Sequence, residues 1–423
     1  MMSRLLQGVR SSTSVRNIAL LTSGTIVAQA INIVATPILS RIYTPADFGL
    51  VGVYTAVVTI CATLITLRYE LRVLLPDTDS EARSVVILAL VLAVTLGGVL
   101  TASTTILPGT VQALLGLQQL GTWLPVAILA SIAAAIISSM NYWFSRCGQY
   151  IKMTALRIAQ TVLLVTLSMV LGFLAVPNGL LYAQVTTLAV SLLMFMYCGY
   201  ASLVHPVLRQ SLVIAAKKHN QAPLFLMPTA LLNVLTIQLP FVVLSTWFSS
   251  DAAGQYRMAW TLLALPSSLV GSAIAQVFFQ RFSSVWPDVV AAKALLFRTW
   301  TILAILGVAP LTIVMLFGEQ LFALVLGNAW RDSGVMAAIL APMVFMSLIH
   351  SPTSTTFVVM GLESKLLFFG IAVAIYRPLC LYLGKYFNNL YLGLALFVVA
   401  EIVQMLVFQY ITVRKLNSAP KSI

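Results

Sequence analysis

Two ionisable residues lie deep inside apolar segments of the C-terminal part of the chain. Arg377 follows Lys365 by 12 residues, and Glu401 follows Leu390 by 11 residues. At about 1.5 Å of rise per residue, they lie about 18 Å and about 16 Å along two neighbouring predicted helices. Charge at that depth in a bilayer costs at least about 2.5–3.5 kcal/mol. The residues are therefore interpreted either as an ion pair that joins the helices, or as an anion-binding arginine beside a glutamate that acts as counter-ion or proton acceptor.

Pro378, directly after Arg377, favours a cavity. A proline inside a helix removes a hydrogen bond and kinks the helix, and kinked membrane helices often line cavities. A guanidinium group suits phosphate because its planar fork donates two parallel hydrogen bonds. The other arginines near helix ends either snorkel to the membrane surface or contribute to an electropositive cavity for pyrophosphate and acidic sugars. The candidate substrate-binding residues are Arg41, Arg68, Arg72, Arg157, Arg257, Arg298 and Arg377, and the candidate ion-coupling residue is Glu401.

Arg68 and Arg72 flank the short segment RYELR. They are four residues apart, so they share a face if the helix continues through them. One interpretation is an ordinary positively charged anchor on the cytoplasmic face. The other is a cytoplasmic gate or a docking site for a lipid headgroup.

Motifs of enzymes are weak or missing in the sequence. Asp77-Thr78-Asp79 has the spacing of many nucleotide-sugar glycosyltransferases, but no domain surrounds it to hold a nucleotide. His205, His219 and His350 are far apart, the four cysteines form no CxxC, and the sequence contains no G-x-x-x-x-G-K-[ST]. We therefore expect no metal ion or other cofactor, no ATP hydrolysis and no enzymatic activity.

The elements that must position these residues are predicted to be membrane helices. The chain is 60% hydrophobic and 8% charged, with a mean hydropathy of +0.99, whereas soluble domains carry about 25% charged residues. A helix needs about 20 apolar residues to cross the hydrocarbon. The sequence therefore predicts an all-α polytopic membrane protein with about 12 transmembrane helices. The apolar runs are 18–39, 48–67, 84–107, 120–143, 153–175, 180–203, 221–246, 254–280, 296–317, 334–361, 366–384 and 390–412.

Lysine and arginine are distributed unequally between the two ends of these runs. With the N-terminus in the cytoplasm, 19 of the 24 basic residues lie on the cytoplasmic side, as the positive-inside rule requires. This predicts that both termini are cytoplasmic. The net charge of +13 then suits anionic lipid headgroups, and no nucleic-acid partner is expected. The N-terminus is similar to a signal peptide, but its apolar run continues past Ala30, which predicts an uncleaved first helix.

Two predicted outward-facing hairpins, Pro37–Tyr54 and Pro240–Trp260, share an order of residues: proline, serine, an aromatic residue, aspartate, glycine and tyrosine. Such a repeat predicts two lobes related by an axis along the membrane normal. The lobes would be an N-terminal six-helix lobe, 1–210, and a C-terminal six-helix lobe, 211–423, around a central cavity. The alternative is that proline, aspartate and glycine recur at any hairpin.

The run Leu21–Pro76, which contains LSRIYTPADFGL and LRYELRVLLP, resembles the polysaccharide biosynthesis and export family. The later segments AAGQYRMAWTLLALP and LGNAWRDSGVMAAILAP are similar to second-half segments of that family. The family includes the Wzx-type O-antigen flippases of the multidrug/oligosaccharidyl-lipid/polysaccharide flippase superfamily. Members are often described with twelve or fourteen spans.

This resemblance implies a flippase for an undecaprenyl-pyrophosphate-linked oligosaccharide, such as an O-antigen or exopolysaccharide repeat unit. It would work by alternating access in the bacterial inner membrane, coupled to an ion gradient. The implied partners are this polyprenyl-pyrophosphate-linked glycan, membrane lipids, polysaccharide polymerase and glycosyltransferases. The alternative is a multidrug exporter of the same superfamily, which the single clearly intramembrane acid, Glu401, disfavours. A polymerase or ligase would need a larger outer loop than the longest one expected here, about 318–333.

Overall fold

The computed structural model describes residues 23–104, 109, 117–203 and 209–418. All regular elements in this part of the chain are helices, so the predicted all-α membrane fold is confirmed. Eleven segments are long and apolar enough to cross a membrane, and α10 forms a twelfth long helix at the predicted run 254–280. Besides the first helix, Ser23–Ile42, the main helices are α2 (Pro45–Ile65), α3 (Asp79–Thr104), α5 (Trp123–Arg146), α6 (Tyr150–Phe173), α7 (Gly179–Leu203), α8 (Arg209–Lys218), α9 (Met227–Trp247), α10 (Ser250–Val285), α11 (Val289–Leu326), α12 (Arg331–Thr353), α13 (Thr356–Val359), α14 (Glu363–Tyr386) and α15 (Leu390–Ser418).

The chain forms two compact units. The N-terminal unit comprises Met1–Tyr43 and Leu50–Gln238, and the C-terminal unit comprises Thr44–Gly49 and Leu239–Ile423. The chain thus passes into the C-terminal unit at Gln238–Leu239, so α8 belongs to the N-terminal unit. The reason is packing: α8 lies against α3, and Ala215 of α8 is buried in the core of the N-terminal unit.

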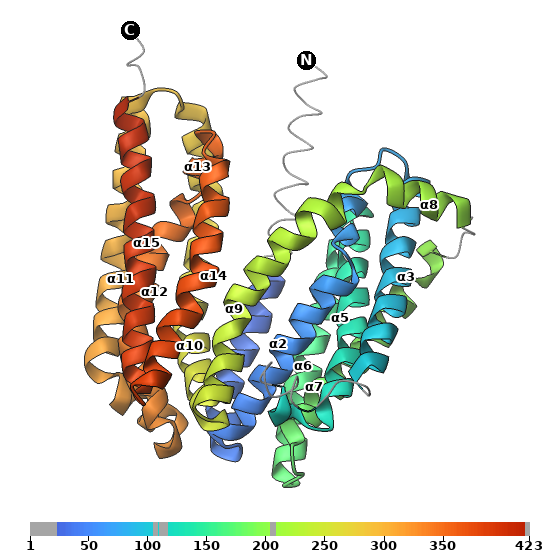
Figure 1. Cartoon of the computed structure of the whole chain (residues 1–423), viewed down its shortest axis with the longest axis horizontal. Helices are drawn as coiled ribbons and strands as arrows, with labels where there is room; N and C mark the ends of the chain where they lie inside the picture. The colour runs from blue at the N-terminus through green and yellow to red at the C-terminus, as the bar shows by residue number, and fades with distance from the viewer. Residues whose placement is uncertain (1–22, 105–108, 110–116, 204–208, 419–423) are drawn as a thin grey trace. The chain divides into compact units, whose positions relative to one another are not determined.

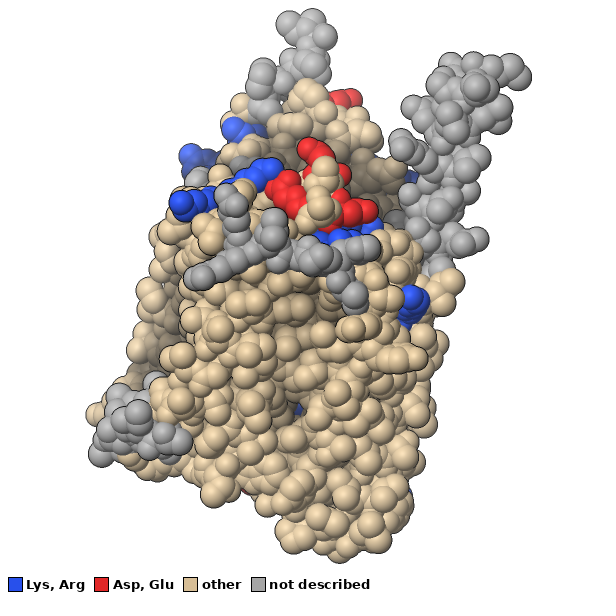
Figure 2. Space-filling view, turned by 90° about the vertical axis from the view of Figure 1, so that its right-hand side faces the viewer, with Lys and Arg blue, Asp and Glu red and all other residues tan. Residues whose placement is uncertain are grey.

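In the N-terminal unit, α3, α5, α6 and α7 pack side by side (Figure 1). Large α5 side chains, among them Met140, Trp143 and Phe144, fill its core. Figure 2 shows one face of the protein, on which charged side chains gather at one end while the remainder is mostly uncharged. Apolar side chains such as Val99 of α3 are largely exposed. This combination is typical of a surface that faces lipid.

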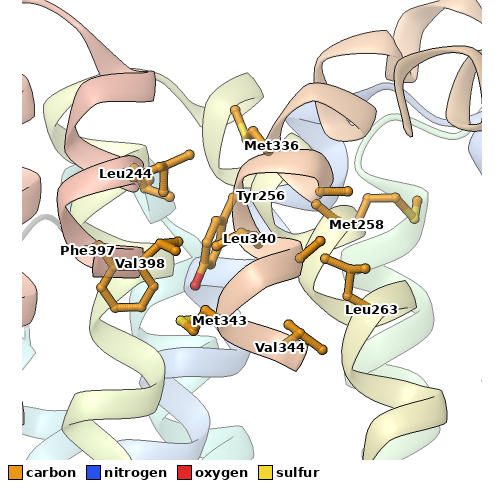
Figure 3. Packing of buried hydrophobic residues seen from close by; sticks show 14 of the residues in the cluster. Leu244, Tyr256, Met258, Leu263, Met336, Leu340, Met343, Val344, Phe397 and Val398 are labelled. Atoms are coloured by element: carbon orange, nitrogen blue, oxygen red, sulfur yellow. The ribbon is translucent and has the colours of Figure 1, made fainter. Parts of the chain in front are cut away.

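In the C-terminal unit, α12 packs against α10, α11 and α15. Figure 3 shows the ring of Tyr256 among Leu340 and Met343 of α12 and Phe397 of α15. Trp330 is completely buried at the edge of this core. The ring of Phe48 meets it edge-on at 5.1 Å between centroids, which explains why the first turn of α2 belongs to this unit.

The repeated hairpin motifs contact each other through corresponding residues. Each motif begins a helix with a capping side chain: the Asp47 amide donates to Thr44 Oγ1 at 3.3 Å, and the Ala252 amide donates to Ser249 Oγ at 3.0 Å. Five residues after each cap lies a glycine, Gly49 or Gly254. A Cβ atom added to either glycine would overlap the backbone of the other motif. The two motifs are therefore packed backbone to backbone, which supports the internal repeat.

A close approach of α14 and α15 fixes the register of this helix pair. A Cβ atom added to Gly384 would lie 2.7 Å from the Cα atom of Gly393, so only glycine allows the two backbones to come this near. Arg377 precedes Gly384 by seven residues, and Glu401 follows Gly393 by eight residues. Both distances are about two helical turns, so the antiparallel helices bring Arg377 and Glu401 to the same level.

Two local expectations from the sequence are wrong. The expected outer loop at about 318–333 is mostly helical, because the apolar sequence continues α11 to Leu326 and the helix ends only at Gly327, with φ of 107°. The helix through Arg68 does not continue either. α2 ends at Ile65, Arg68 itself has φ of 62°, and a 3-10 helix follows from Tyr69 to Leu74.

Candidate functional site

Arg377 and Glu401 form an ion pair between α14 and α15. Arg377 Nε donates to Glu401 Oε1 at 2.5 Å, and the side chains are 18% and 4% exposed. The guanidinium carbon of Arg377 also lies 5.6 Å from the centre of the Phe397 ring, a favourable cation–π distance. A neighbouring contact on the same helices is the hydrogen bond from the Tyr376 hydroxyl to Gln404 Oε1, at 2.5 Å. The first interpretation of Arg377 and Glu401, an ion pair, therefore describes their geometry.

The same two residues also line a pocket, so the pairing does not exclude the cavity interpretation. The pocket lies within the C-terminal unit and has a volume of about 220 Å³. Its walls come from α10, α12, α14 and α15. Its lining residues are Trp260, Ala264, Ser267, Gly271, Met343, Val344, Ser347, Leu348, Ser351, Arg377, Glu401 and Met405.

The charges of this pocket cancel each other. Arg377 and Glu401 are the charged residues among the described ones that line it, and they contact each other directly. Breaking such a buried pair would leave an uncompensated charge, which is strongly unfavourable. The pocket therefore offers donors and acceptors without a net charge. Such a wall suits a polar ligand better than a free anion or cation.

Arg68 belongs to a second, smaller cluster in the N-terminal unit. Its Nη1 atom lies 3.1 Å from Glu70 Oε1, and Glu70 is only 1% exposed. Burial raises the pKa of the Glu70 carboxyl, and the nearby Arg68 only partly opposes this shift. Both Leu67 and Arg68 have positive φ values, at 48° and 62°. Two consecutive non-glycine residues in this conformation store strain, which the buried cluster must stabilise.

The remaining predicted arginines occupy separate places in the fold. Arg72 donates to Gln221 Oε1 at 3.2 Å, and Arg157 of α6 donates to Thr25 Oγ1 at 2.5 Å. Arg41 and Arg298 are exposed, while Arg257 is half-buried in α10. The structure therefore brings Arg377 together with Glu401 and places Arg68 at the N-cap of the 3-10 helix that contains Arg72. It does not bring the predicted arginines of the C-terminal unit into one cluster, since Arg257 and Arg298 lie outside the pocket lining.

Two of the residues weighed as metal or enzyme motifs, Asp79 and His219, form ion pairs or hydrogen bonds with neighbouring side chains. Asp79 contacts Arg146 at 3.0 Å, and Glu81 contacts both Lys218 and His219, at 2.7 Å and 3.2 Å. His205 lies outside the described residues. Within the part of the chain that the structure describes, no three His, Cys, Asp or Glu side chains come together as metal ligands would.

Several pocket residues were missed by the sequence analysis. Trp260, Ala264, Ser267 and Gly271 follow one another at intervals of four, three and four residues, as do Met343, Ser347 and Ser351 at intervals of four. Such spacing places each set on one helix face. A stripe of small and hydroxyl side chains on an apolar helix was the signal that could have revealed them.

Comparisons with known proteins agree with this architecture. The solved structures with similar folds include an inward-facing multidrug resistance MATE family transporter of the MOP superfamily, with a TM-score of 0.74 and 14% identity over 92% of this chain and 95% of that one. They also include a MOP superfamily transporter from Pyrococcus furiosus, with a TM-score of 0.56 and 13% identity over 95% of this chain and 96% of that one. No curated protein gives a significant match.

The sequence itself matches a family model over most of its length. The model is that of the polysaccharide biosynthesis proteins, and the match extends over residues 38–335. It includes LSRIYTPADFGL, LRYELRVLLP and AAGQYRMAWTLLALP, three of the segments on which the resemblance in the sequence rested. This chain belongs to the polysaccharide biosynthesis protein family.

Proposed function

We propose that this protein is a flippase that translocates an undecaprenyl-pyrophosphate-linked oligosaccharide by alternating access. The substrate would be an O-antigen or exopolysaccharide repeat unit, and the site of action the bacterial inner membrane, with both termini in the cytoplasm. Membership of the polysaccharide biosynthesis family and the MOP-type fold support a transporter with a glycan-related role. Its partners would be membrane lipids and the polymerase and glycosyltransferases that handle the same glycan.

The observation that carries the proposal is the Arg377–Glu401 pair on the wall of a hydroxyl-lined pocket. Arg377 lies 14 residues after Glu363 and nine before Tyr386, and Glu401 lies 11 residues after Leu390 and 17 before Ser418. Both are far from the ends of apolar helices, where polar groups are costly and are kept for transport or for pairing. A polar pocket at this depth is what a sugar headgroup needs to cross hydrocarbon.

The other predicted residues receive roles within this proposal. We assign the arginines at positions 41, 68, 72, 157, 257 and 298 to contacts with the pyrophosphate and the headgroup, and Arg377 to contacts with the headgroup. Glu401 is the proposed ion-coupling residue, because protonation of its carboxyl would release Arg377 for substrate. The proposed architecture keeps two repeated six-helix lobes, 1–210 and 211–423, as expected from the sequence.

A multidrug exporter is the second candidate, because the MATE transporters named above share the fold. Organic cations would be bound by acidic side chains. Glu401, however, is paired with Arg377 at 2.5 Å. The other described carboxylates that form ion pairs lie near helix ends or in connecting segments, namely Glu70, Asp79, Glu81 and Glu319. The pocket chemistry therefore favours the flippase.

Reconstitution separates the two candidates. Purified protein in liposomes should translocate a fluorescent lipid-linked oligosaccharide, measured by the fraction that becomes accessible to an added lectin. Arg377→Ala protein and protein-free liposomes serve as controls. Uptake of cationic dyes without any movement of the lipid-linked sugar would establish the exporter instead. An imposed pH gradient should change the rate for the wild-type protein but not for Glu401→Gln.

A further inference from the structure

We infer that the pocket in the C-terminal unit is a subsite for a single uncharged sugar residue of the transported glycan. This inference rests on the proposed function and names the part of the substrate that this pocket takes. It differs from the expectation that Arg377 binds pyrophosphate. Size, charge and the chemistry of the walls each support it.

The size of the pocket limits the ligand to one ring. Pockets that take drug-sized ligands have volumes of about 300–1,000 Å³, whereas this pocket has about 220 Å³. An oligosaccharide with its pyrophosphate cannot enter it as a whole. One sugar unit can enter while the rest of the glycan stays outside.

The charge of the pocket argues against an ionic occupant. An added anion would have to compete with Glu401 for Arg377, and an added cation would have to compete with Arg377 for Glu401. Either exchange leaves one buried charge without its partner, which is strongly unfavourable. A hydroxylated neutral ring avoids this cost, because it can accept a hydrogen bond from the guanidinium and donate one to the carboxylate without separating them.

The walls of the pocket supply the other contacts that a sugar ring needs. The indole of Trp260 lines the pocket and stacks on Tyr256, with ring centres 6.4 Å apart and planes 11° apart. Since Tyr256 is buried, this stacking holds the indole in one orientation. A rigid aromatic face can pack against the C–H groups of a pyranose. Ser267, Ser347 and Ser351 add hydroxyl groups, and Met343 and Met405 add a deformable apolar surface.

Protection of an introduced cysteine tests the inference directly. The native cysteines of the full-length chain are first replaced by alanine, and Ser347→Cys is introduced. A small maleimide alkylates this cysteine, and the rate of alkylation is measured with and without a neutral methyl glycoside. Inorganic pyrophosphate and a tetraalkylammonium ion are added in parallel at the same concentration. The glycoside should slow alkylation at least three-fold, while the two ions should not. Ser80→Cys, exposed at the start of α3, is the control and should react at one rate throughout.

A filled pocket provides the second test. Gly271 lines the pocket, and a Cβ atom there would meet only Pro352, at 3.8 Å. Gly271→Leu should therefore occupy the space without moving the backbone, abolish the protection by glycoside and slow oligosaccharide translocation at least ten-fold. Gly98→Leu is the matched control, since nothing lies within 4 Å of a Cβ atom at Gly98. Its translocation rate should stay within two-fold of the wild type.

The possible outcomes distinguish this inference from the proposed function. If the wild type translocates the lipid-linked sugar but the glycoside does not protect Ser347→Cys, the subsite is wrong and the flippase stands. If pyrophosphate or the ammonium ion protects as well as the glycoside does, the ligand class is wrong. If the glycoside protects but the wild type translocates no lipid-linked sugar, the subsite stands and the flippase proposal fails.

Discussion

Gly384 and Gly393 meet backbone to backbone near the turn of the α14–α15 hairpin, about two helical turns from the ion pair of Arg377 and Glu401. A Cβ atom at Gly384 would come within 2.7 Å of the Gly393 Cα atom, and that neighbour is backbone, which cannot rotate away. The glycines therefore set the distance between the two helices at the pair. The geometry of the candidate site depends on residues that contain no functional group.

Gly384→Ala should consequently destabilise the protein and weaken transport. We expect a cost of about 1–3 kcal/mol from overpacking and a lower translocation rate, because the ion pair must lengthen when the helices separate. Thermal unfolding in detergent and the liposome assay measure the two effects. Gly98→Ala is the control: it has open space around it, and alanine is the better helix former, so its stability should not fall. Equal behaviour of the two variants would contradict the prediction.

The Arg377–Glu401 pair should show strong coupling in a double-mutant cycle. Glu401→Met or Arg377→Met alone should cost about 3–5 kcal/mol, because either leaves the other charge buried without its partner. Removing both charges, with Arg377→Met and Glu401→Met together, should recover much of that stability but not transport. Unfolding of the four proteins gives the coupling free energy. Additive costs would mean that the two side chains do not interact.

Glu70 should make stability depend on pH in a defined direction. Its pKa in the folded protein is raised by burial, so the folded state binds the proton more readily than the unfolded state does. The cost of burying the charged carboxyl is therefore present at pH values above the raised pKa and disappears as the pH falls through it. Glu70→Gln lacks this charge at every pH.

The melting temperature of Glu70→Gln minus that of the wild type should therefore be largest at high pH. This difference should become smaller as the pH is lowered. Scanning fluorimetry between pH 5 and pH 8 measures it. The opposite trend would mean that Arg68 outweighs burial and lowers the pKa of the carboxyl. Asp77→Asn, in an exposed connecting segment, controls for general effects of charge.

Phe48 should stabilise the C-terminal unit although it precedes the rest of that unit, Leu239–Ile423, by almost two hundred residues. Its ring packs edge-on against the buried Trp330, a contact worth about 0.5–1.5 kcal/mol beyond the burial of area. Phe48→Ala should speed amide hydrogen exchange in Asn328–Trp330 and the first turns of α12. Exchange in α5–α7 should change less, and Leu129→Ala, at an exposed position, should change neither region.

The sequence predicted most of the fold because hydrophobic length decides which segments become membrane helices. Each apolar run corresponds to a helix of the described chain, and Arg377 and Glu401 stood out because charge is rare in such runs. Helix ends were harder to predict. The extension of α11 to Leu326 and the break after Ile65 depend on local backbone conformations that composition does not encode.

The pocket itself was predictable only in part. Its ionisable residues are visible in the sequence, but Ser267, Gly271 and Ser347 are ordinary residues in apolar helices. They become neighbours through the packing of α10 and α12, which is a tertiary property. The same holds for the pairing of Arg377 with Glu401, which required the glycine contact to set the register.

The assignment of Thr44–Gly49 to the C-terminal unit has a consequence for how the protein is made. This hexapeptide leaves the ribosome long before α10 and α12, whose residues complete its surroundings. During synthesis the hexapeptide, attached to α2, lacks its packing partners until the second half of the polypeptide has been translated. A C-terminal half produced by dividing the chain anywhere between residues 50 and 238 would lack this hexapeptide, which the N-terminal half carries. The C-terminal unit can therefore complete its folding only together with the N-terminal part of the chain.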